Sequence, residues 1–279
     1  MTKTLDTLVD DVYSLFDPKI KHEVNDQYIE EFGENIKTIL RESLLGRDET
    51  NADVLRFSAL GKPDRQLWYD AQGTDAEELL AKTRFKFLYG HVIEQLVLFL
   101  IKEAGHTVEA EQMEIEVDGV KGHIDAIIDG VLVDVKSASP YGYKKFENNT
   151  IHEDDPFGYI VQISGYSNVV TPDKGPAFIA FDKVHGDLCV TPISVSITEA
   201  HPPGPRIEHL KKVIASKEPP ERCYKDIPDG KSGNMKLDTG CSYCKYKKAC
   251  WPGLRTFLYS TGPRYLTKVV REPDVFEAV

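Results

Sequence analysis

Long hydrophobic runs are missing from this chain of 279 residues. The longest apolar stretch, residues 92–101, is interrupted by Glu94 and Gln95 and is shorter than the roughly 18 residues that a membrane-spanning helix needs. No secretory signal peptide is indicated, because residues 1–16 lack a basic start followed by an apolar segment. We therefore expect an intracellular, cytoplasmic protein without a membrane partner.

An excess of positive charge is also missing, since 45 acidic residues against 34 lysines and arginines give a net charge of −11. This balance argues against unspecific phosphate binding by the whole surface, but it allows a local basic groove or a site where metal ions meet phosphates. Cysteine is scarce, with five in all, and four of them crowd into residues 223–250. In a reducing compartment such a cluster favours a metal site over disulfides.

The order of the expected elements indicates an α/β fold. Helical or turn-rich patterns occupy residues 1–50, 57–73, 76–106, 159–171 and 207–217. Strands are predicted at 108–117, 175–183 and 187–195, a β-hairpin at 123–137 and a polar loop at 139–158. We expect three parts: a helical N-terminal region (1–75), an α/β core (76–200), and a cysteine-rich module with a C-terminal tail (201–279).

The predicted hairpin has the sequence HIDAIIDGVLVDVKS, with Asp-Gly at 129–130 as its two-residue loop. In such a loop the numbers of paired residues sum to a constant, so Asp125 is expected opposite Asp134, where like charges destabilise the strand pair. Lys136 shares a face with Asp134. The charges could point into water, but the strands are apolar on both faces, which predicts burial and a need for a cation.

A third acid, Glu94, lies in an almost wholly apolar helix, and Gly90 leaves open space one turn before it. Glu94 could reach solvent past the helix edge or pair with a lysine; a carboxylate on a buried face is also a candidate for function. Two aspartates, a glutamate and a lysine suit a hard divalent ion such as Mg²⁺, which can hold a phosphate and activate water. The set predicts hydrolytic chemistry.

These residues resemble the PD-(D/E)XK nuclease superfamily, and in particular its RecB-like exonucleases. Ile124-Asp125 and, after eight residues, Asp134-Val135-Lys136 are similar to its signature, with isoleucine in place of proline. Gly90-x-x-x-Glu94 resembles its helical motif in the glutamate form of lambda-type exonucleases, and Gln162-x-x-x-Tyr166 resembles the RecB-type motif. The resemblance covers residues 57–250 and implies a restriction-endonuclease-like core, with a central mixed β-sheet flanked by helices.

The resemblance also implies roles for single residues. Mg²⁺ or Mn²⁺ would be held by three carboxylates and one carbonyl, those of Glu94, Asp125, Asp134 and Val135. Lys136 would assist the attacking water, Gln162 would orient the lysine or the phosphate, and Tyr166 would contact the DNA backbone.

The cysteines have the spacing Cys241-x2-Cys244-x5-Cys250, and Cys223 is the natural fourth ligand. Cys189 lies in an alternating strand and is expected to be a small core residue. Four thiolates suit either Zn²⁺ or a [4Fe–4S] cluster.

RecB-like nucleases with an iron–sulfur cluster, among them CRISPR-adaptation nucleases, end in the same spacing. Their first cysteine usually precedes the catalytic helix, where residues 58–69 of this chain contain none. We expect a [4Fe–4S] cluster with its fourth ligand moved to Cys223, and zinc is the alternative.

The expected function is a metal-dependent DNA exonuclease for recombination, repair or phage DNA processing, in a bacterium or a phage-infected host. It could act with a recombination or helicase partner. The alternatives are a site-specific or structure-specific DNA endonuclease and a catalytically silent module that binds DNA ends.

Overall fold

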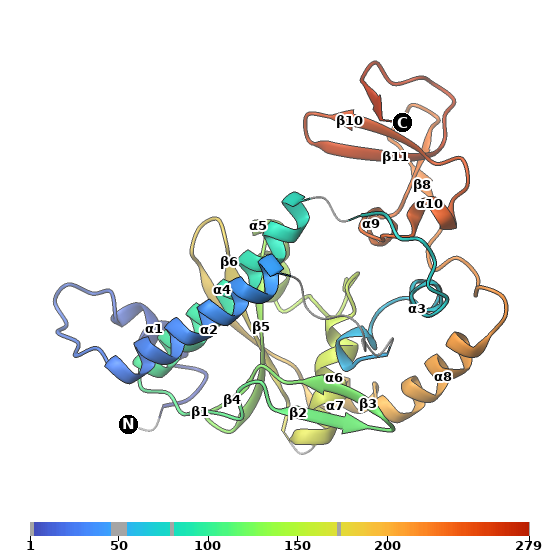
Figure 1. Ribbon diagram of the computed structural model, residues 1–279. Helices are drawn as coiled ribbons and strands as arrows, with labels where there is room; N and C mark the ends of the chain where they lie inside the picture. Colours follow the sequence, from blue (N-terminus) through green and yellow to red (C-terminus); the bar gives the residue numbers. More distant parts are fainter. Residues whose placement is uncertain (1–2, 46–54, 79–80, 172–173, 279) are drawn as a thin grey trace. The chain divides into compact units, whose positions relative to one another are not determined.

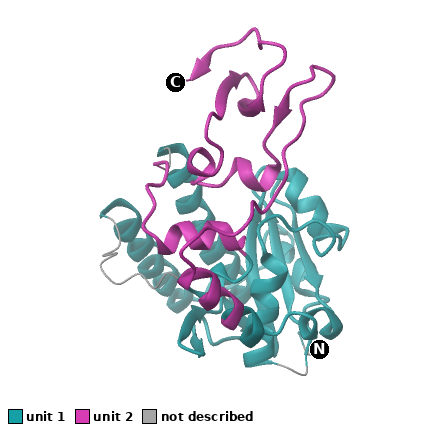
Figure 2. Ribbon diagram, turned by 90° about the vertical axis from the view of Figure 1, so that its right-hand side faces the viewer, with its two compact units in different colours: residues 1–61, 80–207 teal, residues 62–79, 208–279 magenta. Residues whose placement is uncertain are grey.

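The computed structural model describes residues 3–45, 55–78, 81–171 and 174–278 (Figure 1). The chain forms two compact units (Figure 2). Unit 1 comprises Met1–Gly61 and Leu80–Ile207, and unit 2 comprises Lys62–Leu79 and Glu208–Val279. The predicted division at residues 75 and 200 stays a prediction. Residues 46–50 of the predicted N-terminal helices lie outside the described residues. No described helix is long and apolar enough to cross a membrane.

Unit 1 is built around a mixed five-stranded sheet of order β1-β4-β5-β6-β7, in which β5 and β6 are parallel and the other neighbours are antiparallel. Its strands are β1 (Val108–Glu109), β4 (Ala126–Ile128), β5 (Val131–Ala138), β6 (Ala177–Asp182) and β7 (Leu188–Pro192). A separate hairpin is formed by β2 (Glu114–Val117) and β3 (Val120–His123). The helices are α1 (Leu8–Ser14), α2 (Asp26–Leu45), η2 (Phe57–Ala59), α4 (Ala81–Glu103), α5 (Pro140–Glu147), α6 (Tyr159–Val170) and α7 (Val195–Glu199).

Apolar side chains cover both faces of this sheet, so helices pack on each side (Figure 1). Val133 and Val135 of β5 point to the face that α1 and α4 cover. Phe178 and Ala180 of β6 point to the face that α5 and α6 cover. A central mixed sheet with helices on both faces confirms the predicted α/β class.

Two local predictions were wrong. Residues 108–117 do not form one strand, because Ala110 and Gln112 adopt left-handed backbone conformations, with φ of 53° and 52°. β1 therefore stays in the main sheet, whereas β2 leaves it for the separate hairpin. Residues 139–158 are not all loop either: α5 begins after Ser139, whose side chain accepts a hydrogen bond from the Gly142 amide.

Unit 2 combines short helices with a five-stranded antiparallel sheet of order β12-β10-β11-β9-β8. Its elements are α3 (Asp64–Ala71), most of α8 (Pro203–Ala215), β8 (Ile227–Pro228), β9 (Met235–Lys236), α9 (Thr239–Ser242), α10 (Lys247–Cys250), β10 (Arg255–Tyr259), β11 (Gly262–Lys268) and β12 (Glu277–Ala278). Side-chain contacts join residues 62–78 to the segment that contains Cys241, Cys244 and Cys250. Tyr246 donates to Asp70 at 2.7 Å, and the buried Lys247 pairs with Glu77 at 2.5 Å.

Gly122 of β3 has no room for a side chain, because an added Cβ would lie 2.4 Å from the Phe57 Cβ and 3.0 Å from a ring carbon of Tyr166. We expect Gly122→Ala to lower the free energy of unfolding by about 1–3 kcal/mol. Gly33→Ala on α2 is the matched control, since its added Cβ meets nothing within 4 Å, and it should stabilise the helix by up to about 1 kcal/mol. Urea denaturation followed by circular dichroism checks both; equal effects would contradict the close approach.

Candidate active site

The hairpin β4–β5 has the predicted register. Ala126 pairs with Val133 and Ile128 with Val131. The turn residues Asp129 and Gly130 have φ of 51° and 77°, as a type I′ turn requires. Asp125 directly precedes β4, and its carboxylate lies against β5, close enough to Asp134 for the two charges to interact. The structure therefore brings the two carboxylates together through a purely local rule.

Asp134 is buried beside a lysine, and Asp125 is half-buried next to it. Asp134 is only 3% exposed, and its Oδ2 lies 2.6 Å from Lys136 Nζ. Asp125 Oδ2 accepts a hydrogen bond of 2.7 Å from the Val135 amide. Burial, followed by the charges of Asp134 and Glu94, raises the pKa of Asp125 well above its ordinary value. Burial also raises the pKa of Asp134, although Lys136 opposes it.

Glu94 reaches the same carboxylates from α4. Its charge helps to raise the pKa of both Asp125 and Asp134, and its side chain is 19% exposed. The side-chain Nε2 of Gln112 donates to Glu94 Oε1 at 3.0 Å, and its backbone N–H donates to the backbone carbonyl of Asp125 at 3.2 Å. Gln112 is thus hydrogen-bonded to both Glu94 and Asp125. Its own backbone is left-handed, a conformation that glutamine seldom adopts. The sequence pattern did not single out this residue.

Helix α6 adds three side chains near the lysine. Lys136 Nζ lies 4.8 Å from the centre of the Tyr159 ring, a cation–π contact. Burial raises the pKa of Tyr166, while a hydrogen bond from Gln162 opposes that shift. The buried Tyr166 ring stacks on Phe57, with the ring centres 5.2 Å apart. Burial lowers the pKa of Lys136, but Asp134 and Asp125 more than offset this, so the lysine stays charged. Contact of Tyr166 with DNA stays a prediction.

A divalent cation fits this donor set. Three carboxylates, two of them with raised pKa values, lie within electrostatic reach of one another and of Lys136. Among the described residues their oxygens are not all within 4.8 Å of one another, so an ion would have to draw the three side chains closer together. A hard dication would stabilise their charged forms, and Mg²⁺ or Mn²⁺ prefers such oxygen ligands. The Val135 amide donates its hydrogen bond to Asp125. A role of the Val135 carbonyl as a metal ligand stays a prediction.

We expect Asp125→Asn to stabilise the metal-free protein at neutral pH, because the amide keeps the shape of the carboxylate without its charge. The folded-state pKa of Asp125 lies above the unfolded value, so wild-type stability falls as pH rises through that window. The gain should therefore vanish below about pH 4, where both states are protonated. Urea denaturation in EDTA at both pH values measures it. Mg²⁺ should then stabilise the wild type more than the variant; equal stabilisation would contradict the metal site.

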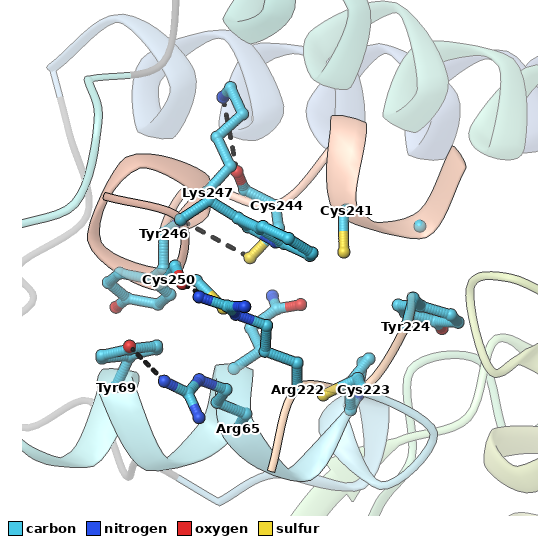
Figure 3. A pocket seen from close by; sticks show the side chains of 14 residues that line it. Arg65, Tyr69, Arg222, Cys223, Tyr224, Cys241, Cys244, Tyr246, Lys247 and Cys250 are labelled. Atoms are coloured by element: carbon cyan, nitrogen blue, oxygen red, sulfur yellow. Dashed lines mark hydrogen bonds between the residues drawn. The ribbon is translucent and has the colours of Figure 1, made fainter. Parts of the chain in front are cut away.

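A second cluster lies wholly in unit 2. Cys223, Cys241, Cys244 and Cys250 line one pocket, and Figure 3 shows the Cys241 and Cys244 sulfurs pointing into it. Arg65, Tyr69 and Gln66 of α3 line the same pocket, as do Arg222 and Trp251. Cys189 lies on β7 of unit 1 and is not part of this lining.

The thiols affect one another electrostatically. Burial, then Cys250 and Cys244, raises the pKa of Cys241 to about 12. Burial raises the pKa of Cys223, while the backbone amides of Arg65 and Gln66 in the first turn of α3 oppose this shift. Among the described residues, no three of these sulfurs lie within 4.8 Å of one another. A metal would favour the thiolate forms, so the residues fit a thiolate-bound group.

Sequence reasoning found the four cysteines but not the arginines beside them. Arg222 Nε donates to the Cys250 carbonyl at 3.1 Å, and its guanidinium lies 4.0 Å from the centre of the Trp251 ring. Arg65 reaches the Pro220 carbonyl and donates to Tyr69 at 3.2 Å. Arg65 lies in residues 58–69, the segment where the resemblance implied a cysteine ligand. Its place in that segment was the sequence feature that could have pointed to a position near the cysteines.

Asp182, His185 and Asp187 also gather in unit 1, after β6. Asp182 is already bound by its own loop, since its Oδ1 accepts from the Val184 amide at 2.9 Å and its Oδ2 pairs with His185 at 2.8 Å. These contacts account for the cluster as a structural turn.

No known family profile and no curated protein matches the chain. Among solved structures, the crystal structure of SSO0001 is similar with a TM-score of 0.40 and 17% identity, over 80% of this chain and 96% of that chain. An alkaline exonuclease, LHK-Exo from Laribacter hongkongensis, gives a TM-score of 0.38 and 17% identity, over 57% and 89%. LHK-Exo in complex with dAMP gives 0.36 and 16%, over the same shares. These likenesses are loose, so a function for this chain has to rest on its own site residues.

Proposed function

We propose that this protein is a metal-dependent DNA nuclease that acts as an exonuclease, in recombination, repair or phage DNA processing. One observation carries the proposal: the buried carboxylate of Asp134 lies close enough to that of Asp125 for the two charges to repel, and a charged lysine lies 2.6 Å from Asp134. A purely structural role does not require this repulsion, whereas a divalent cation and a phosphodiester explain it.

Glu94, Asp125 and Asp134 are the residues that would hold the ion. When bound, Mg²⁺ or Mn²⁺ supplies positive charge for the phosphate and lowers the pKa of water. Lys136, fixed between Asp134 and the Tyr159 ring, donates hydrogen bonds to the attacking water or to the phosphate oxygens. Gln162 orients the phosphate or the lysine from α6.

For unit 2 we propose that the four cysteines hold a [4Fe–4S] cluster with a structural role. The spacing Cys241-x2-Cys244-x5-Cys250 supports this proposal, because the iron–sulfur nucleases that the chain resembles end in the same spacing. Arg65 and Arg222 suit its negative charge.

Digestion of end-labelled linear DNA beside covalently closed circles, with Mg²⁺ or Mn²⁺ present, tests the activity. We expect the linear DNA to be trimmed and the circles to survive, and EDTA to stop the reaction. Cutting of circles would make the protein an endonuclease. Binding of ends without any cleavage would leave a silent end-binding module.

A further inference from the structure

The first turns of α4 carry large aromatic side chains that no described residue covers. Phe85 is 68% exposed and Phe87 is 56% exposed, although each is large and apolar. The helix that presents them is also the one that carries Glu94.

Phe87 shares a helical face with the acid, whereas Phe85 does not. At 3.6 residues per turn, positions 87, 90 or 91, and 94 lie above one another, while position 85 falls on the opposite side. Seven residues along a helix span about 10 Å, which is close to the reach of one or two nucleotides from the scissile phosphate.

This face of α4 is uncovered because the strand beneath it ends. An added Cβ at Gly90 would lie 3.4 Å from Ser137 Oγ, so the helix still lies over β5 at this point. β5 ends one residue later, at Ala138. Phe87 is one turn before Gly90 in α4, at the level where β5 has ended, and its ring is left 56% exposed.

Two cations flank the ring of Phe87. Arg84 and Lys86 are three and one residues before it, both exposed, and neither has an ion-pair partner among the described residues. In a chain of net charge −11, unpaired cations around an exposed aromatic ring complement a polyanion with flat bases.

We propose that Phe87 is a stacking platform for an unpaired base of single-stranded DNA next to the active site, with Arg84 and Lys86 on the neighbouring phosphates. This inference rests on the proposed function and adds a preference for a single-stranded end. A duplex keeps its bases stacked on one another, so only an unpaired base can use the ring.

Fluorescence anisotropy of a labelled oligothymidylate, with EDTA present, tests the platform without any cleavage. We expect Phe87→Ala to raise Kd by about 5- to 100-fold, the effect of losing one stacked base, and Phe87→Trp to retain tight binding. A labelled blunt duplex should bind both variants about equally. The assay needs no turnover, so a protein without nuclease activity could still show this binding pattern. That outcome would refute the proposed nuclease function but not the stacking of a base on Phe87.

Phe85→Ala is the matched control, because it removes the same exposed ring from the opposite side of the same helix. Its Kd for oligothymidylate should stay within about twofold of the wild type. An unchanged Kd for Phe87→Ala would overturn the proposal. Equal losses for the two alanine variants, or an equal loss on blunt duplex, would overturn it too, because the effect would then be general rather than stacking at position 87.

Discussion

Replacing Lys136 by alanine is expected to lower kcat for DNA cleavage by about 100- to 1,000-fold while leaving DNA binding nearly unchanged. The lysine is held in one place by Asp134 and by the Tyr159 ring, and its pKa is raised, so it is charged and already oriented. Such a donor acts mainly in the transition state, so its loss lowers turnover more than affinity. Single-turnover cleavage and DNA binding in EDTA separate the two effects.

Lys136→Arg and Lys144→Ala are the controls. Arginine keeps the charge but not the point-like geometry, so it should recover part of the rate. Lys144, on α5, pairs with Glu147 at the surface, and its loss should change neither kcat nor KM. A wild-type rate in Lys136→Ala, in protein free of other nucleases, would remove the lysine from the reaction and with it the main support for hydrolysis.

The hairpin that carries the acids could be predicted because its register follows from one local signal. An Asp-Gly pair between β-branched runs fixes the turn, and the turn fixes which residues face each other. The same signal occurs at Asp118-Gly119, whose φ values of 49° and 78° close the β2–β3 hairpin. That turn was missed because the alternation before it continues from β1 into β2 and reads as one strand.

Contacts between distant segments could not be predicted in this way. Gln112 reaches Glu94 from a left-handed stretch of backbone. The alternation of apolar and polar residues in the sequence does not predict such a bend. Arg65 meets the cysteines through the packing of α3 in unit 2, more than 150 positions before Cys223 to Cys250 in the chain. The acids and the lysine of the candidate active site, and the four cysteines, could be recognised from the sequence. Few roles other than metal binding and catalysis suit these residue types in that pattern.

Replacing Cys241 by serine is expected to abolish the metal of unit 2 and to loosen that unit, while unit 1 keeps its fold. The anaerobically purified wild type should be brown and carry roughly four irons per chain, and the variant should be colourless. Ligand binding and local folding are one equilibrium in small metal modules, so loss of one thiolate removes both. Unit 1 has its own apolar core on both faces of its sheet and does not depend on the metal.

The two tryptophans of the chain make this separation measurable. Trp68 and Trp251 both belong to unit 2, and Trp251 lines the cysteine pocket, so tryptophan fluorescence follows unit 2 alone. Hydrogen exchange of β4–β6 follows unit 1. The matched control is Cys189→Ala, which removes the one cysteine of the unit 1 sheet and should leave iron content and colour unchanged. One zinc per chain in a colourless wild type would keep the four ligands and refute the iron–sulfur cluster. A folded protein with neither metal would refute the metal site, because the four thiols would then be stable in their protonated forms.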